Sequence, residues 1–225
     1  MENSRPMNPW LSLPSEAPYV LANDRPPIDA FNKRAAADNQ YDLSLFPEPY
    51  FGRSDAPVVF LALNPGWNPQ DAAMHRQPEF ASQVRSSLAH ALAPFPFLHL
   101  QPDYITPGGL WWRRITRPLI AEAGFDAVAK NIVCVQFFPY HSAAFGSHAI
   151  CVPSQTYGFG LVRSAMSQGA EIVVMRSWRL WVTAIPQLLH YERLHMVLNP
   201  RNPTVSPQNM PDGFTTVLAR VTAGT

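Results

Sequence analysis

The chain has 225 residues, of which 47% are hydrophobic and 15% are charged, with a formal net charge of +1. This length suits one α/β domain, and the hydrophobic content is high enough to form a core, which excludes a disordered chain. The near-neutral charge excludes a global basic field, although a local basic patch would be enough to hold nucleic acid. Two cysteines, Cys134 and Cys151, exclude a four-cysteine zinc site or iron–sulfur cluster within one chain. No apolar segment approaches membrane-spanning length, so we expect a cytoplasmic monomer without membrane contact, metal or cofactor.

Residues 1–55 are rich in proline, asparagine and aspartate but also carry scattered aromatic side chains. We interpret them as an irregular N-terminal arm, with a short helix within 30–40, that packs on a domain formed by residues 56–225. The domain begins with an apolar strand over 57–63, and a polar loop follows over 68–78. The later elements are predicted, in chain order, as helix 78–93, loop 94–109, helix 110–123, strand 131–138, helix 154–168, strand 171–176, a helix from 178, strand 194–198, and an edge strand or extended segment over 214–221.

Four buried strands that alternate with helical patterns predict a three-layer α/β/α sandwich with a four-stranded, mainly parallel sheet. Three of these strands are closed by polar side chains and by residues that stop a strand. Asn64-Pro65-Gly66 follows the first strand, Gln136 lies at the end of the second, and Asn199-Pro200 follows the fourth. The carboxyl ends of parallel strands share one edge of the sheet, where open α/β sheets bind ligands. We therefore expect the three amide side chains to converge there.

This order of strand ends resembles the uracil-DNA glycosylase superfamily, above all its mismatch-specific branch. The shared motifs are Leu63-Asn64-Pro65-Gly66 and Asn199-Pro200, and the resemblance covers residues 57–210. It implies a uracil-DNA glycosylase-like fold and a DNA glycosylase that excises uracil or a related damaged base by hydrolysing the N-glycosidic bond. It also implies that Asn64 orients the attacking water and that Asn199 stabilises the negative charge on the leaving base. Gln136 would then select the flipped base through its Watson–Crick edge.

The remaining contacts with the base and with DNA are expected from residues close to these strand ends. In this family an aromatic ring stacks on the flipped base, and four side chains remain alternatives for that role: Trp67, Phe137, Phe138 and Tyr140. Gly66 would let the backbone approach the substrate closely. His141 is either a polar group of the pocket or a loop residue bonded to backbone. Arg201, with Arg176 and Arg179, follows strand ends or helix starts, so these cations could meet backbone phosphates.

Two departures from the family pattern keep a second hypothesis open. An asparagine at position 64 cannot act as a general base, and the turn over Asn199 to Ser206 is longer than the usual one. The alternative is a catalytically inactive member of the same fold that binds a nucleotide or nucleic acid. A third hypothesis is a hydrolase of another nucleoside or small molecule, although no Gly-x-Ser-x-Gly elbow occurs for a serine hydrolase. The two leading hypotheses share DNA or a nucleobase-containing ligand as the partner.

Overall fold

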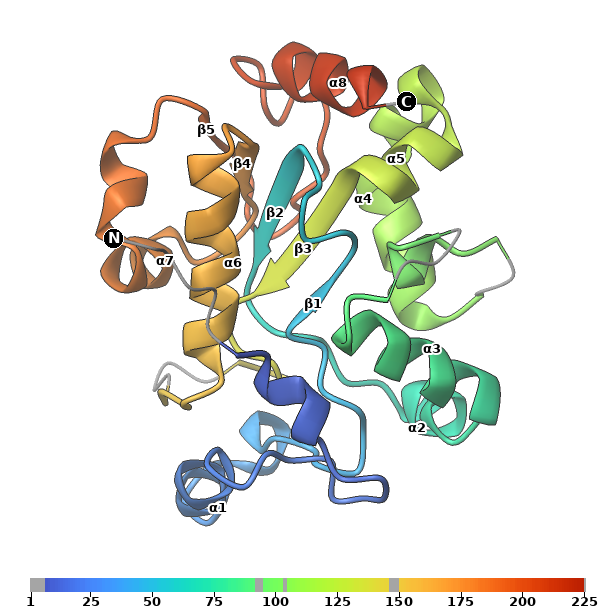
Figure 1. Ribbon diagram of the computed structural model, residues 1–225, viewed down its shortest axis with the longest axis vertical. Coiled ribbons are helices and arrows are strands. Elements are labelled where there is room, and N and C mark those ends of the chain that lie inside the picture. The colour runs from blue at the N-terminus through green and yellow to red at the C-terminus, as the bar shows by residue number, and fades with distance from the viewer. Residues whose placement is uncertain (1–6, 92–94, 103–104, 146–149, 225) are drawn as a thin grey trace.

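The computed structural model describes residues 7–91, 95–102, 105–145 and 150–224, and these form an α/β fold around one five-stranded mixed sheet (Figure 1). The strand order is β1-β3-β2-β4-β5. The strands are β1 (Tyr50–Phe51), β2 (Val58–Ala62), β3 (Ile132–Gln136), β4 (Glu171–Val174) and β5 (Leu194–Met196). β2 pairs in parallel with β3 and β4, and β4 pairs in parallel with β5.

The predicted sheet of four strands was too small by one, because β1 pairs antiparallel with β3 at one edge. Its two residues, Tyr50 and Phe51, are too few to produce the period of two that marks a strand in a sequence. Each of the four predicted strand segments does contain a parallel strand. Their continuous burial in β2, β3 and β4 matches what a sheet covered on both faces requires.

Helices cover both faces of this sheet, which gives the sandwich-like layering. The described helices are α1 (Arg25–Asn32), α2 (Pro69–His75), α3 (Pro78–Leu88), α4 (Pro107–Ala123), α5 (Phe125–Asn131), α6 (Gln155–Ser167), α7 (Trp178–Ala184) and α8 (Phe214–Ala223). Figure 1 shows α6 and α7 on one side of the strands and α4 and α5 on the other. None of the described helices combines the length and the apolar character needed to cross a membrane.

The helix that reaches the carboxyl edge of the sheet, α4, is delimited by local sequence signals. The Thr106 side chain accepts a hydrogen bond from the Gly109 N–H (2.8 Å), and Pro107 occupies the first turn, where no N–H is needed. Gly124 ends the helix with a φ of 85°. These signals fix the start of α4 near the loop that follows β2.

Four segments differ from their predicted structure. The short helix expected within 30–40 lies earlier, as α1, and only a short 3-10 helix, Ala37–Asn39, follows it in that range. Residues 68–78, predicted as a loop, contain α2, because the Asn68 side chain caps the Gln70 N–H (2.9 Å) and Pro69 starts the helix. The segment over 214–221 is helical rather than extended and buries one face of α8 against α4 and α5. A separate helix, α5, was not predicted, since its seven residues make only about two turns, too few to show the apolar spacing of a helix.

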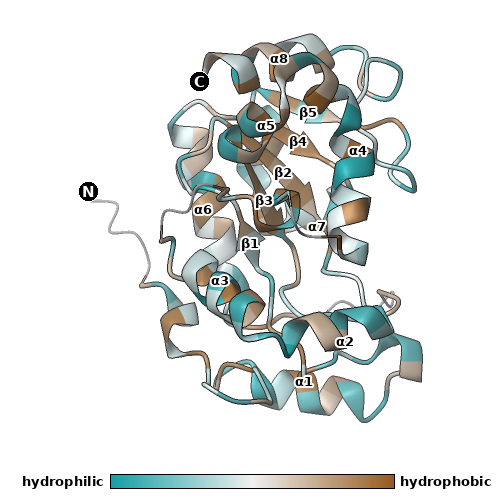
Figure 2. Cartoon of the chain, turned by 90° about the vertical axis from the view of Figure 1, so that its right-hand side faces the viewer, coloured by the Kyte–Doolittle hydropathy of each residue, from teal (hydrophilic) through white to brown (hydrophobic). Residues whose placement is uncertain are grey.

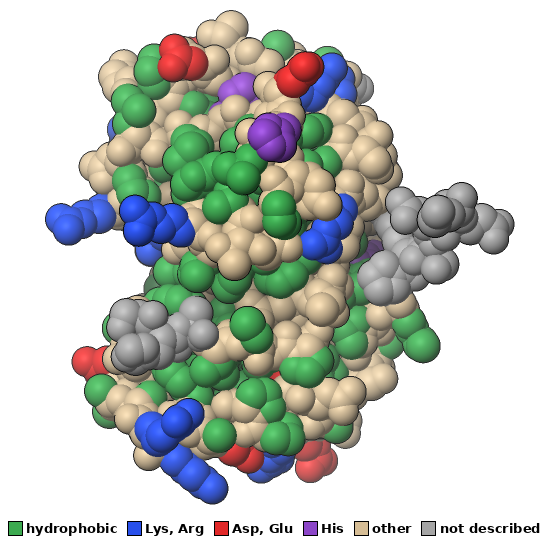
Figure 3. Space-filling view, turned by 90° about the vertical axis from the view of Figure 1, so that its left-hand side faces the viewer, with side chains coloured by type: hydrophobic (Ala, Val, Ile, Leu, Met, Phe, Trp, Pro, Cys, Tyr) green, Lys and Arg blue, Asp and Glu red, His purple; other side chains and the backbone are tan. Residues whose placement is uncertain are grey.

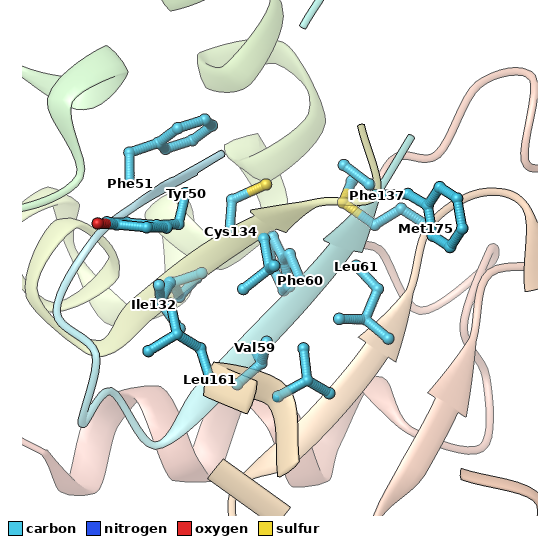
Figure 4. Packing of buried hydrophobic residues seen from close by; sticks show 14 of the residues in the cluster. Tyr50, Phe51, Val59, Phe60, Leu61, Ile132, Cys134, Phe137, Leu161 and Met175 are labelled. Atoms are coloured by element: carbon cyan, nitrogen blue, oxygen red, sulfur yellow. The ribbon is translucent and has the colours of Figure 1, made fainter. Parts of the chain in front are cut away.

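The core is centred on β2, all five residues of which are buried. Figure 4 shows Phe60 and Leu61 of this strand pointing to opposite faces of the sheet, close to Cys134 and Met175 of neighbouring segments. The Trp181 side chain from α7 is fully buried and donates from Nε1 to the Ala62 carbonyl (3.0 Å). That bond ties α7 to the last residue of β2.

The N-terminal arm belongs to the same packed unit. Trp10 and Ile28 from the arm are buried in the common core. The buried Tyr140 hydroxyl donates to the Asp24 carboxylate (2.7 Å), and the Leu21 N–H donates to the same hydroxyl (3.3 Å). Figures 1 and 2 show α1 of the arm and α2 of the domain beyond the carboxyl ends of β2 and β3, the edge at which a ligand site was expected.

Candidate functional site

A pocket of about 490 Å³ lies at the carboxyl ends of β2 and β3. Its walls come from the turn after β2, the segment after β3, helix α2 and the start of α4, together with Arg176, which lies two residues after β4. The volume is within the range of small-molecule sites, about 300–1,000 Å³. The side chains used below are Glu48, Asn64, Trp67, Asp71, His75, His99, Trp111, Gln136, His141, Phe145 and Arg176.

Asn64 lies where the sequence predicted it, in the pocket wall directly after β2. Its Nδ2 donates to the Ser142 hydroxyl (2.9 Å) and to the Pro65 carbonyl (3.0 Å). Gly66 forms a parallel bridge with Ser142, and the Ser142 N–H donates to the Pro65 carbonyl (3.4 Å). The Asn64 turn is therefore held against the chain that continues from β3, which leaves the Asn64 Oδ1 as the side-chain atom available to a ligand.

Gln136, the last residue of β3, brings a second amide into the same pocket. Its side chain is 7% exposed, and its Oε1 atom is buried without a hydrogen-bond partner among the described residues. Leaving a buried polar atom unpaired costs about 1–3 kcal/mol, so this atom is a candidate hydrogen-bond acceptor for a ligand in the pocket. The structure thus brings Asn64 and Gln136 together as the sequence predicted.

The aromatic candidates separate into one pocket residue and three core residues. Trp67 lines the pocket and is 37% exposed, with its Nε1 donating to the Asp42 carboxylate (2.7 Å). Phe137 packs edge-on against Trp181, and Phe138 stacks on Tyr41 with ring centroids 4.1 Å apart.

Tyr140 is fully buried and hydrogen-bonded to Asp24 of the arm, so it is a core residue like Phe137 and Phe138. None of the three lines the pocket. Trp111 from α4 and Phe145, which the sequence analysis did not select for the base, join Trp67 as pocket aromatics.

Asn199 and Arg201 lie outside the pocket wall. Asn199 is exposed, and its Oδ1 accepts hydrogen bonds from the N–H groups of Arg201 (3.1 Å) and Asn202 (3.2 Å) within its own turn. The reason is topological. β4 separates β5 from β2, and neighbouring strands are about 4.8 Å apart, so the end of β5 is displaced from the Asn64 turn by about 10 Å.

A buried carboxylate, Glu48, forms part of the pocket floor and was missed by the sequence analysis. Its Oε2 lies 3.0 Å from Nε2 of His99, and both side chains are less than 10% exposed. Burial opposes the charged form of Glu48, but the charge and hydrogen bond of His99 are the main effects that outweigh it and lower the pKa of Glu48 to about 2. In return, Glu48 overcomes the burial of His99 and raises the pKa of that imidazole.

His141 connects this buried group to the Asn64 turn. Its Nδ1 lies 2.6 Å from the Gly66 carbonyl, and its Nε2 lies 3.1 Å from the Phe46 carbonyl. The Glu48 carboxylate lies 3.9 Å from the same Nε2 atom, so His141 also adjoins the buried acid. His141 therefore positions the turn and the arm, which is the backbone-bonded role among its two predicted alternatives.

Glu48, His75 and His141 place potential metal-ligand atoms within 4.8 Å of one another. Their hydrogen bonds do not suit a cation. The Nδ1 atom of His75 accepts the Phe46 N–H (2.9 Å), which leaves the ring proton on Nε2, while both nitrogens of His141 face carbonyl oxygens. Burial, together with the charge of His141, lowers the pKa of His75 to about 3, so that ring is neutral at pH 7. The Glu48 region is better described as a buried ion pair of Glu48 and His99 beside the neutral imidazole of His75.

Two further charged side chains line the pocket. Asp71 on α2 has a raised pKa, chiefly because it is partly buried, and the nearby Glu48 adds to that effect. Arg176 follows β4, and its guanidinium lies 5.8 Å from the centre of the Trp111 ring. Asp71 was not selected from the sequence, although it follows the Asn64 turn closely, whereas Arg176 was among the cations expected after strand ends.

Comparison of the chain with protein-family models, with curated proteins and with solved structures gives no match. The site therefore has to be interpreted from its own geometry. On the face shown in Figure 3, hydrophobic side chains gather across the middle, and both signs of charge are scattered around them. No single-sign field extends over the described residues of that face, which agrees with the formal net charge of +1.

Proposed function

We propose that the pocket binds a nucleobase and that the protein is a DNA glycosylase-like hydrolase that excises uracil or a related damaged base. The observation that carries the proposal is the Gln136 amide, buried at the pocket and lacking a partner for Oε1. A side-chain amide offers both donors and an acceptor, which is the pattern needed to bind the edge of a pyrimidine. Trp67 and Trp111 supply aromatic surface beside it.

The proposed reaction transfers a water molecule across the N-glycosidic bond. The water oxygen forms a bond to C1′ of the deoxyribose, and the base leaves with the electron pair of the broken bond. Asn64, with Oδ1 available, would orient the water, and the Asp71 carboxylate would accept its proton, since a raised pKa makes a carboxylate a stronger base. The Gln136 amide would donate to an oxygen of the departing base as negative charge develops there.

A second candidate is a binding module that holds a nucleobase without cleaving it. The observation that favours it concerns Asn199, which the family resemblance assigns to the leaving base. The side-chain oxygen of Asn199 already accepts two N–H groups of its own turn, and the residue is exposed outside the pocket wall. The pocket then offers Gln136 and aromatic rings for binding, with fewer donors to stabilise an anionic base.

The deciding experiment is cleavage of labelled oligonucleotides, with excess protein and alkaline treatment afterwards. Single- and double-stranded substrates would carry uracil, hypoxanthine, xanthine, or thymine opposite guanine. We expect cleavage of a uracil-type substrate that Asn64→Ala and Gln136→Ala each reduce at least about tenfold, whereas Asn199→Ala, a change outside the pocket, retains most of the activity.

Two results would count against this assignment. Cleavage that is lost in Asn199→Ala but kept in Gln136→Ala would place the chemistry elsewhere. No cleavage by folded protein across the whole panel, with nucleobase binding retained, would support the binding module instead.

A further inference from the structure

Arg176 is a cation whose hydrogen-bonding capacity is largely unused. Among the described residues, its guanidinium makes one recorded hydrogen bond, from Nη2 to the Arg201 carbonyl at the long distance of 3.4 Å. Its Nε atom is buried without a partner, and no carboxylate in the described part of the chain lies within 4.0 Å. A guanidinium has five N–H donors, and a partly buried one is normally matched to an anion.

The start of α4 faces the same part of the pocket. Thr106, Pro107 and Gly108 line the pocket together with Arg176 and Trp111. The Gly109 and Leu110 N–H groups are bonded to Thr106 (both 2.8 Å), whereas the Gly108 N–H belongs to the first helical turn, which has no intrahelical acceptor. A helix of 17 residues places positive partial charge at this end, which favours an anion.

The His99 ring packs against Gly108 at the start of α4 and also lines the pocket. A Cβ atom at this position would lie 3.1 Å from Nδ1 of His99, tighter than ordinary packing allows. His99 is 6% exposed, and this Nδ1 atom has no hydrogen-bond partner among the described residues. A buried imidazole nitrogen without a partner, in the pocket wall beside a helix start and an unmatched guanidinium, is a second and independent observation that points to a polar ligand group.

From these features we infer that Arg176 and the first turn of α4 bind a phosphate group of the ligand whose base contacts Gln136. The inference rests on the proposed role of the pocket as a nucleobase site and adds that the ligand is a nucleotide unit. The pocket volume of about 490 Å³ equals that of roughly sixteen water molecules at about 30 Å³ each. A single pyrimidine has far fewer non-hydrogen atoms, so the pocket is larger than a base alone requires.

Guanidinium groups suit this role because their planar donor pairs match two phosphate oxygens, and the Arg176 guanidinium lies over the Trp111 ring, 5.8 Å from its centre. The phosphate has two possible sources: a free nucleoside monophosphate or the backbone of DNA on either side of the flipped base. Both present the same chemistry to Arg176. The two sources differ in one measurable respect, namely whether the phosphate of the free mononucleotide by itself tightens binding.

The test measures binding to the full-length protein by quenching of tryptophan fluorescence, since Trp67 and Trp111 line the pocket. The probes are uracil, deoxyuridine, deoxyuridine 5′-monophosphate and a short single-stranded oligonucleotide with one uracil. The variants are Arg176→Gln, Arg176→Lys, and Arg114→Gln as a control that removes an exposed arginine of α4 outside the pocket. Thermal unfolding of each variant verifies that it is folded.

We expect the wild type to bind the monophosphate or the oligonucleotide at least about tenfold more tightly than deoxyuridine. Arg176→Gln should abolish that difference while leaving the affinity for deoxyuridine unchanged. Arg176→Lys should keep part of the difference, and Arg114→Gln should keep all of it for the monophosphate. A preference limited to the oligonucleotide would assign the phosphate to DNA, and one shared by the monophosphate would assign it to a nucleotide.

The inference is overturned if wild-type protein shows no preference for the phosphate-bearing ligands. It is also overturned if Arg176→Gln weakens deoxyuridine and its monophosphate equally, because a merely structural arginine would do so. Failure of the proposed function gives a different result. In that case the phosphate preference and its dependence on Arg176 persist, while no base is released from any oligonucleotide.

Discussion

Replacing Glu48 by glutamine removes the negative charge from the pocket floor at nearly constant volume. The carboxylate is 7% exposed and lies 3.0 Å from His99 Nε2 and 3.9 Å from His141 Nε2. Its pKa falls from the ordinary value of 4.5 to about 2, and at about 1.4 kcal/mol for each pH unit this gap corresponds to about 3 kcal/mol of folding stability at pH 7. We therefore expect Glu48→Gln to lower the free energy of unfolding by about 3 kcal/mol, in line with the cost of breaking a buried ion pair.

The pH dependence follows from the directions of the two pKa shifts. For Glu48 the folded pKa lies below the unfolded one, so its contribution is complete above about pH 4.5 and is lost as the pH falls towards 2. For His99 the folded pKa is raised, so its contribution is complete below the unfolded value of 6.5 and is lost as the pH rises through the folded pKa. The pair is therefore most stabilising between about pH 4.5 and 6.5.

The assay is urea-induced unfolding of the wild type, Glu48→Gln and the control Glu192→Gln, which changes an exposed glutamate. The control should stay within about 0.5 kcal/mol of the wild type, as surface substitutions usually do. Glu48→Gln should also lose part of the stability decrease that the wild type shows from pH 4.5 downwards. A cost below about 1 kcal/mol at pH 7, or equal acid dependence in variant and wild type, would refute the buried ion pair as a source of stability.

Two further predictions separate ligand binding from stability and test backbone conformation. Gln136→Leu should keep the free energy of unfolding or raise it by up to about 1 kcal/mol, because it removes an unpaired buried polar atom. The same substitution should abolish binding of deoxyuridine. A stability loss above about 2 kcal/mol would show that the amide has a protein partner. Gly52→Ala should lower the free energy of unfolding by more than about 3 kcal/mol, since φ is 108° and a Cβ would overlap the Ile132 carbonyl oxygen. Gly124→Ala also has a positive φ, 85°, but its Cβ would meet open space. In the same urea titration it should therefore cost only about 1 kcal/mol. Similar costs for the two glycines would contradict the steric argument.

Much of the fold was accessible from local sequence patterns. The strand over 57–63 and the segment over 131–138 were predicted because a strand buried on both faces must be apolar throughout. The same reasoning predicted that Asn64 and Gln136 meet, since parallel neighbours end at a common edge. It did not predict β1, whose two residues become a strand only by pairing with β3.

The sequence by itself thus determined the class of fold, the central parallel strands and two of the amides in the pocket, because burial and turn-forming residues are properties of short segments. Only the tertiary structure decided what surrounds those amides. Glu48 from the arm meets His99 across two intervening strands and two helices, and Arg176 meets Trp111 across four further elements. The position of Asn199 was also decided at that level, because the insertion of β4 between β2 and β5 moves its turn away from the pocket. Contacts between distant segments depend on strand order and helix packing, and no local pattern of residues encodes them.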